Sequence, residues 1–191
     1  MLSKAVALGE VSSLPEFNAE RHYMVKLINR NLPSHLSKWQ PTIDSMLEKV
    51  VDEGDIFVTI DQRLVPAGNT HRVGGVHVDG YWMEGLSCHG GNGRWKQSSH
   101  SQHLPWAGEV ESLFLLSDVS GCVVYEGEWE GTPNEKGGCE HIDLSCLEQK
   151  VLLPNVVYAG DTGAMLHEGT KFNIDTYRTL VRLNVKGWLP C

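Results

Sequence analysis

The sequence has no long hydrophobic run and no excess of basic residues. Its uncharged, mostly apolar runs, such as residues 151–160, are far shorter than the ~20 residues that a membrane-spanning helix needs, so no membrane partner is expected. There are 16 Lys and Arg residues against 24 Asp and Glu residues, which gives a formal net charge of −8 at pH 7. This acidic balance disfavours a protein that binds nucleic-acid phosphates non-specifically, although a single base could still be flipped into a local pocket.

Closely spaced cysteine pairs are also missing. The five cysteines, at positions 88, 122, 139, 146 and 191, form no CxxC motif and leave one over, whereas a secreted disulfide-rich domain has an even number at closer spacing. Glu10 interrupts the N-terminal region before any signal-peptide-like hydrophobic stretch develops. The sequence therefore predicts reduced thiols and a cytoplasmic protein. It also contains neither a P-loop nor a nucleophile-elbow motif.

The composition that is present, with 41% hydrophobic and 21% charged residues, is typical of a folded globular chain. Its length suits a single domain over residues 1–191. Residues 1–54 are expected to form a helical N-terminal support. Asn18 is placed to cap a helix over residues 19–29, and apolar residues at helical spacing predict a second helix from about residue 41 or 42 to residue 51.

From residue 55 onward the pattern changes to short β-type runs separated by Gly, Pro and Asn. The predicted strands are residues 56–65, 75–83, 113–118, 121–126, 150–159 (with a break at Pro154), 163–168 and 178–186. Many short strands without helices between them are typical of a mainly β protein, an antiparallel sandwich or barrel. Residues 84–112 form a long Gly-, Ser- and His-rich insertion, which is either a lid or binding loop or a disordered surface loop.

His77 and Asp79 are the first candidate metal ligands. Alternate residues of a strand point to the same face, so both side chains would point the same way. An imidazole and a carboxylate suit Fe(II), Mn(II) or Zn(II). The sequence contains a second His-x-Asp pair, His141 and Asp143, but that copy follows a polar, turn-like segment. It is also too close to a third candidate ligand, His167, to leave room for the intervening strands, so the first copy is favoured.

Two arginines on the last predicted strand indicate an anionic partner. Arg178 and Arg182 lie on the strand face that also carries Leu180 and Asn184, and the opposite face is apolar. Burying a guanidinium without a partner is costly. Either this is an edge strand with a solvated face, or the two arginines bind a small carboxylate.

His77-x-Asp79, the distal His167 and an arginine eleven residues after it together resemble the Fe(II)/2-oxoglutarate-dependent dioxygenase superfamily. The spacing is most similar to its taurine dioxygenase and phytanoyl-CoA hydroxylase branches. Residues 158–169 (YAGDTGAMLHEG) also resemble the turn and strand that carry the distal histidine there. The resemblance covers about residues 56–186. It implies a double-stranded β-helix (jelly-roll, cupin-like) barrel, with the N-terminal helices packed on its outside.

The same resemblance implies an oxidoreductase with catalytic, metal-binding residues His77, Asp79 and His167 around one Fe(II). Such an enzyme consumes 2-oxoglutarate and O₂, hydroxylates its substrate and releases succinate and CO₂. Arg178 would bind the far carboxylate of 2-oxoglutarate, and Arg182 would either assist there or hold an anionic group of the substrate. Substrate contacts are expected in the insertion, at Arg94, Trp95 and Trp106. A small molecule, a protein side chain and a nucleobase all stay open as substrates, and the oligomeric state is not specified.

Three alternatives compete with this interpretation. A cupin would carry a second histidine in place of Asp79 and would give the arginines of the last strand no role. A non-enzymatic jelly-roll, acting as a binding or structural module, would differ from the enzyme in its metal content. A zinc site made by Cys139, His141 and Cys146 is disfavoured because no fourth ligand lies nearby in the sequence.

Overall fold

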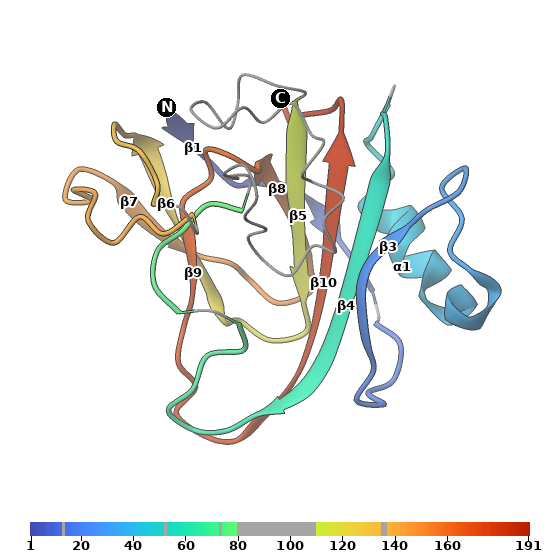
Figure 1. Cartoon of the computed structure of the whole chain (residues 1–191). Helices are drawn as coiled ribbons and strands as arrows, with labels where there is room; N and C mark the ends of the chain where they lie inside the picture. The colour runs from blue at the N-terminus through green and yellow to red at the C-terminus, as the bar shows by residue number, and fades with distance from the viewer. Residues whose placement is uncertain (13, 52, 73, 80–109, 135–136) are drawn as a thin grey trace.

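A computed structural model describes residues 1–12, 14–51, 53–72, 74–79, 110–134 and 137–191 (Figure 1). Within these residues the protein is mainly β, with one short helical segment made of η1 (Ser34–Trp39) and α1 (Gln40–Met46). No helix in this part of the chain is long and apolar enough to cross a bilayer. The strands are β1 (Leu2–Ser3), β2 (Val6–Glu10), β3 (Arg21–Lys26), β4 (Ile56–Val65), β5 (Glu111–Ser117), β6 (Cys122–Glu128), β7 (Glu148–Val151), β8 (Val156–Asp161), β9 (His167–Gly169) and β10 (Thr176–Lys186).

Six strands form one antiparallel sheet in the order β2-β8-β5-β10-β4-β3. β10 lies inside this sheet and pairs along its length with β4 on one side and β5 on the other, as Figure 1 shows. The three strands are rich in Val, Ile, Leu, Phe and Thr, the residue types that favour strands. The sequence prediction of a buried core strand at residues 178–186 is therefore confirmed, and the alternative of an edge strand is wrong.

A second, smaller antiparallel sheet is built around β6. Strands β1 and β7 pair with β6, and β9 also pairs with it, joining His167 to Val124. In the described residues the two sheets share no strand pairing, so they do not close into a barrel. The observed architecture is thus two antiparallel sheets in a mainly β protein.

The two faces of the six-stranded sheet have different partners. On one face, η1 and α1 pack Trp39 and Ile43, both fully buried, into a cluster with Ile60, Phe114 and Val181 of the sheet. Figure 1 shows α1 beside β3 and β4, on the side away from β6, β7 and β9. The opposite face is therefore left to pack against the smaller sheet.

Between the sheets, apolar side chains from both sides form a second cluster. Leu113 and Leu115 of β5 contact Tyr158 of β8, and β6 contributes Val124. Met165, just before β9, completes this cluster. Arg178 and Arg182 lie in the same interior. Both are on one face of β10, where Arg182 pairs with Leu115 and the neighbouring Leu180 pairs with Ser117.

The prediction of a helix over residues 19–29 is wrong. Residues Arg21–Lys26 form β3, which pairs with β4, and positive φ angles at Ala19 (50°) and Met24 (48°) are incompatible with a continuous right-handed helix. The edge of β4 offers backbone hydrogen bonds to this segment, and pairing with β4 is favoured over a local helix. The second predicted helix exists, but α1 ends at Met46 and does not continue to residue 51.

Most predicted strands are confirmed. The prediction at 56–65 coincides with β4, those at 113–118 and 121–126 correspond to β5 and β6, and the break at Pro154 separates β7 from β8. The prediction at 163–168 is largely wrong, because residues 162–164 form a turn, in which the carbonyl of Asp161 accepts from the Ala164 and Met165 amides, and β9 starts only at His167. Of the prediction at 75–83, the described residues 75–79 contain an isolated bridge at His77 and no continuous strand. Residues 84–109 of the insertion lie outside the described residues.

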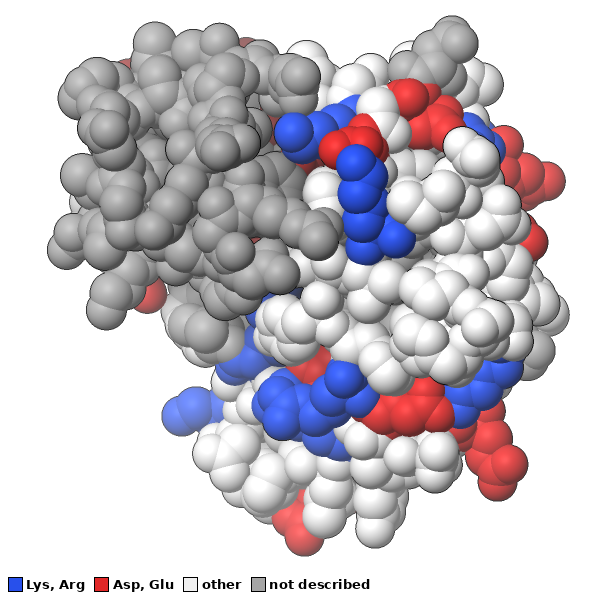
Figure 2. Space-filling view, turned by 45° about the vertical axis from the view of Figure 1, so that its right-hand side comes forward, with Lys and Arg blue, Asp and Glu red and all other residues white. Residues whose placement is uncertain are grey.

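Charged side chains of both signs lie close together on the face drawn in Figure 2, where Lys and Arg groups lie next to Asp and Glu groups. Ion pairs of the described residues include Lys26 with Asp55 at 2.6 Å and Arg30 with Glu53 at 2.5 Å. The arginines of the candidate site have a different environment, because they are buried between the sheets.

Candidate metal centre

A pair of backbone hydrogen bonds brings the two predicted histidine ligands together. The amide of each residue, His77 and His167, donates to the carbonyl of the other at 3.0 Å, as in a narrow antiparallel pair. Directly paired residues project their side chains from the same face, so the two imidazole rings lie 4.4 Å apart between centroids. His77 and His167, which are 90 positions apart in the sequence, are thus joined by main-chain pairing.

Asp79 reaches the same site because it follows His77 by two residues in extended backbone. The amide of Val78 donates to the Gly137 carbonyl at 3.0 Å and that of Asp79 to the Thr162 carbonyl at 3.1 Å, which fixes the segment. Val76 and Val78 point the other way, into an apolar cluster. This alternation confirms the prediction that His77 and Asp79 share a face.

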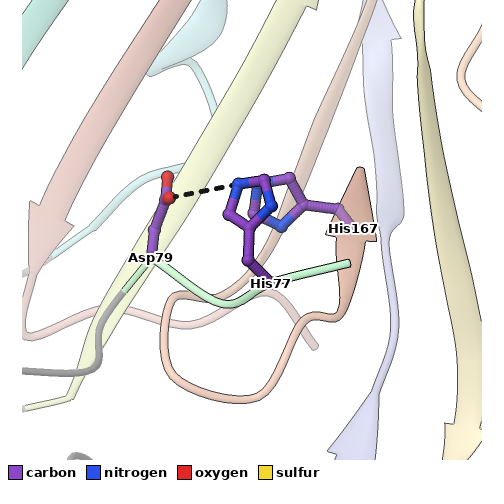
Figure 3. A group of neighbouring side chains, drawn as sticks. All are labelled: His77, Asp79 and His167. Carbon is purple, nitrogen blue, oxygen red and sulfur yellow. Dashed lines mark ion pairs between the residues drawn. The ribbon is translucent and has the colours of Figure 1, made fainter. Parts of the chain in front are cut away.

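Three possible ligand atoms, one from each of His77, Asp79 and His167, lie within 4.8 Å of one another. His77 Nε2 is 3.8 Å from Asp79 Oδ1, the contact drawn in Figure 3. Asp79 and His167 are buried, with 3% and 6% exposure, and the His77 side chain is 12% exposed. Among the described residues, these three side chains form the group of His, Cys, Asp or Glu residues that could hold a metal ion.

Hydrogen bonds to backbone carbonyls orient both imidazoles. His77 Nδ1 lies 2.8 Å from the Gly75 carbonyl oxygen, and His167 Nδ1 lies 3.0 Å from the Met165 carbonyl oxygen. A carbonyl accepts only, so each Nδ1 carries the proton and each Nε2 has the lone pair. Backbone carbonyls commonly hold metal-binding histidines in this way. The donor set of two neutral imidazoles and one carboxylate suits a divalent ion such as Fe(II), and it leaves coordination positions for other ligands.

Arg182 contacts the candidate ligand Asp79 directly. Its Nη2 donates to Asp79 Oδ2, while Asp79 Oδ1 faces His77. Burial lowers the pKa of Arg182 to about 9, which still leaves the guanidinium charged at pH 7. The two carboxylate oxygens of Asp79 therefore have separate neighbours, one the guanidinium and the other an imidazole.

Arg178 has neutral hydrogen-bond partners. It is 3% exposed, and it donates from Nε to Ser117 Oγ at 2.8 Å and from Nη1 to the Gly121 carbonyl at 3.3 Å. Its guanidinium lies 5.7 Å from the centre of the Phe172 ring. Among the described residues no carboxylate forms an ion pair with it. Burial lowers the pKa of Arg178, and the charges of Asp118 and Asp61 oppose that effect without forming an ion pair with the guanidinium.

A pocket between the sheets joins these groups. His77, His167, Arg178 and Arg182 all line it, together with Arg72 at the turn that precedes His77. Most of the remaining wall is apolar and comes from both sheets and from the segment around residue 153: Leu115, Leu116, Val119, Leu152, Leu153, Val156 and Leu180. The pocket thus combines imidazole and guanidinium groups with mostly apolar walls.

The two metal sites that the sequence disfavours are not assembled in the described residues either. His141 is exposed and contacts the Thr132 carbonyl oxygen at 3.0 Å, and Asp143 accepts from the Ser145 amide. Cys139 is buried, whereas Cys146 is exposed. Neither the second His-x-Asp pair nor the cysteine–histidine set therefore forms a ligand cluster in the described residues.

Sequence reasoning missed the residues that surround Arg178. Ser117, Gly121 and Phe172 are far from it along the chain, or separated by a turn, and no short motif connects them. The pairing of Leu180 with Ser117 could have been inferred only from the strand register. The predicted substrate residues Arg94, Trp95 and Trp106 lie outside the described residues.

No protein-family model and no curated protein matches this chain. Seven chains of solved structures match it. One of them is an apo non-heme monooxygenase, ThoJ, with a TM-score of 0.40 and 13% sequence identity. That match covers 76% of this chain and 51% of the other, so this chain spans about half the length of the solved protein.

Proposed function

We propose that this protein is an Fe(II)- and 2-oxoglutarate-dependent oxygenase, built on a jelly-roll fold, that hydroxylates its substrate. The observation that carries the proposal is the assembly of His77, Asp79 and His167 in one buried cluster that opens on the same pocket as the unpaired cation Arg178. Two histidines and one carboxylate are the ligand set of non-haem Fe(II) oxygenases.

Each residue has a defined task in this proposal. His77, Asp79 and His167 hold the metal, and the carbonyls of Gly75 and Met165 keep the two imidazoles in the tautomer that binds it. Bound Fe(II) supplies the oxygen chemistry, in which one O₂ and one 2-oxoglutarate yield succinate, CO₂ and a hydroxylated substrate. The protein contributes orientation and a mostly apolar site.

Arg178 binds the far carboxylate of 2-oxoglutarate. A carboxylate supplies the counter-ion that its buried guanidinium lacks, and charge-assisted hydrogen bonds of this kind are about twice as strong as neutral ones. Ser117 and Gly121 already fix the guanidinium, so little conformational freedom is lost when the carboxylate binds. Arg182 is held by Asp79, and it therefore positions the metal-binding carboxylate.

Anaerobic addition of Fe(II) and 2-oxoglutarate to the purified protein tests the proposal. We expect a visible charge-transfer absorption band that requires both additions and is lost in His77→Ala, together with the bound metal. His141→Ala removes the histidine of the other His-x-Asp pair and is the matched control, in which the band and the metal content stay unchanged. If no band forms and His77→Ala retains as much metal as the wild type, the proposal is wrong. Binding of metal without 2-oxoglutarate would instead favour a cupin-like binding protein.

A further inference from the structure

Arg72 is a third cation in the pocket, and the functions proposed above do not use it. It lines the pocket together with both histidines, Arg178 and Arg182, and it lies five residues before His77 on the segment that delivers the metal ligands. It is only partly buried, unlike the arginines of β10. Its place is therefore where the pocket meets the surface.

The only polar partner of the Arg72 guanidinium among the described residues is a neutral phenol. Nη1 donates to the hydroxyl oxygen of Tyr23, and the guanidinium lies 5.2 Å from the centre of the same ring. No carboxylate of the described residues forms an ion pair with it. The aromatic face and the hydroxyl hold the guanidinium in place and leave its positive charge uncompensated.

The local backbone of β3 presents Tyr23 for this contact. The pairing of β3 with β4 shifts register between His22 and Val25, and Met24 has a φ of 48°. Irregularities of this kind re-aim a side chain at the edge of a sheet and are common beside active sites. Tyr23 is 41% exposed, so its ring contacts Arg72 at the surface rather than filling the core.

The other two arginines of the pocket have anionic partners in the proposed function. Asp79 offsets Arg182, and the 2-oxoglutarate carboxylate would offset Arg178. Arg72 then remains as a positive charge in a pocket of a protein whose net charge is −8. A cation in such a position attracts and orients an anion.

We propose that Arg72, held by Tyr23, binds an anionic group of the substrate, so that the oxygenase acts on a small molecule carrying a carboxylate, sulfonate or phosphate. This inference rests on the proposed function for the position of the reacting carbon near the metal. The apolar part of the substrate would contact the leucine and valine side chains that line the pocket. The Arg72 charge selects the class of substrate, whereas the metal ligands determine the reaction.

Binding of simple probes tests this assignment. Hexanoate and hexanesulfonate are titrated by calorimetry into protein that holds Mn(II) and saturating 2-oxoglutarate, with hexanol and hexylamine as probes of equal chain length. We expect both anions to bind at least about tenfold more tightly than hexanol, the difference that one charge-assisted contact of about 1.4 kcal/mol provides. Arg72→Gln should abolish this preference, Arg72→Lys should keep part of it, and Tyr23→Phe should weaken it.

Lys49→Gln is the matched control, because it removes one positive charge from an exposed lysine that follows α1 and does not line the pocket. It should leave the preference for anions intact. The proposal is overturned if hexanol binds as tightly as hexanoate, if the Arg72 and Lys49 variants behave alike, or if the anions displace 2-oxoglutarate. The same titration without Mn(II) and 2-oxoglutarate separates the two proposals. If the protein binds neither Mn(II) nor 2-oxoglutarate but still binds the anions in a way that depends on Arg72, the anion site is supported and the oxygenase is refuted.

Discussion

Arg178 and Arg182 lie four residues apart on one face of β10, yet their surroundings assign them different tasks. Arg182 pairs with Asp79, a candidate metal ligand, whereas Arg178 donates to the hydroxyl of Ser117 and the carbonyl of Gly121. Burying a cation without an ion-pair partner costs free energy of folding, and the hydrogen bonds of Arg178 and the charges of Asp118 and Asp61 offset only part of it. A site for an anion is the simplest physical reason for keeping Arg178 there.

Gly121→Ala should weaken the binding of 2-oxoglutarate without touching the metal ligands. A Cβ at this position would lie 2.9 Å from Cζ and Nη1 of Arg178 and 2.6 Å from Cζ of Phe172, so the guanidinium must move. We expect the dissociation constant for 2-oxoglutarate, measured by titrating the charge-transfer band, to rise by about tenfold or more, as small displacements at such sites do. Metal affinity should stay unchanged.

Gly74→Ala provides the control for that substitution. A Cβ at Gly74 meets only Thr70 side-chain atoms at 3.8 Å, an ordinary contact distance. Equal 2-oxoglutarate affinities for the two alanine variants would show that the position of Arg178 does not govern co-substrate binding.

At the residue scale, the sequence predicted what depends on strand periodicity. His77 and Asp79 were placed on one face because they are two residues apart, and the structure confirms that they and His167 meet. Ser117, Phe172 and Tyr23 were missed because their contacts depend on register and on a bulge, neither of which leaves a pattern in the sequence.

The elements show the same division between local pattern and tertiary contact. The limits of β4 follow from the sequence because a run rich in β-branched and other apolar residues is bounded by Gly54 and Pro66. The Asn18 cap signal instead predicts a helix where β3 forms, because it is the pairing with β4 that determines the conformation of this segment. The length and hydrophobic periodicity of the central strands therefore make them predictable from the sequence, whereas the edge strand β3 is not.

Ile43→Ala should destabilise the protein without altering the site. Ile43 of α1 is fully buried on the outer face of the six-stranded sheet, opposite the face that carries Arg178 and Arg182. Removing its side chain should lower the free energy of unfolding by about 3 kcal/mol, measured by urea denaturation. The folded variant should bind metal and 2-oxoglutarate as the wild type does.

The exposed residue Glu48 supplies the comparison for this prediction, since Glu48→Ala should change the free energy of unfolding by less than about 0.5 kcal/mol. A large loss of metal affinity in folded Ile43→Ala would mean that the outer cluster shapes the site through the sheet.

Across the whole molecule, Glu111 gives stability a dependence on pH that the predicted site does not explain. It is 4% exposed, its Oε1 accepts from Asn184 at 2.9 Å, and its Oε2 has no hydrogen-bond partner in the described structure. Burial raises the pKa of Glu111 from 4.5 to about 7. The folded protein therefore holds this proton over a range in which the unfolded chain has lost it.

The sign of the effect follows from that difference. Stability from protonated Glu111 is fully present below pH 4.5 and is lost as the pH rises toward about 7. In the wild type, Glu111 should lower the free energy of unfolding by on the order of 2 kcal/mol across this range. Glu111→Gln should abolish this pH-dependent decrease. The measurement is the difference between wild type and variant at each pH, because this cancels the contributions of other groups. Parallel curves for the two proteins would show that Glu111 does not titrate between these limits.

The position of β10 inside the large sheet also determines the order in which the molecule can assemble. β4 and β5 do not pair with each other, and β10, the last strand along the chain, joins them. During synthesis, neither strand can complete its hydrogen bonding until residues 176–186 have emerged. The same strand carries Arg178 and Arg182, so the pocket gains its buried charges in the step that closes the sheet. Pairings between residues this far apart in the chain favour slow folding, and the nascent protein exposes the edges of β4 and β5 until that step.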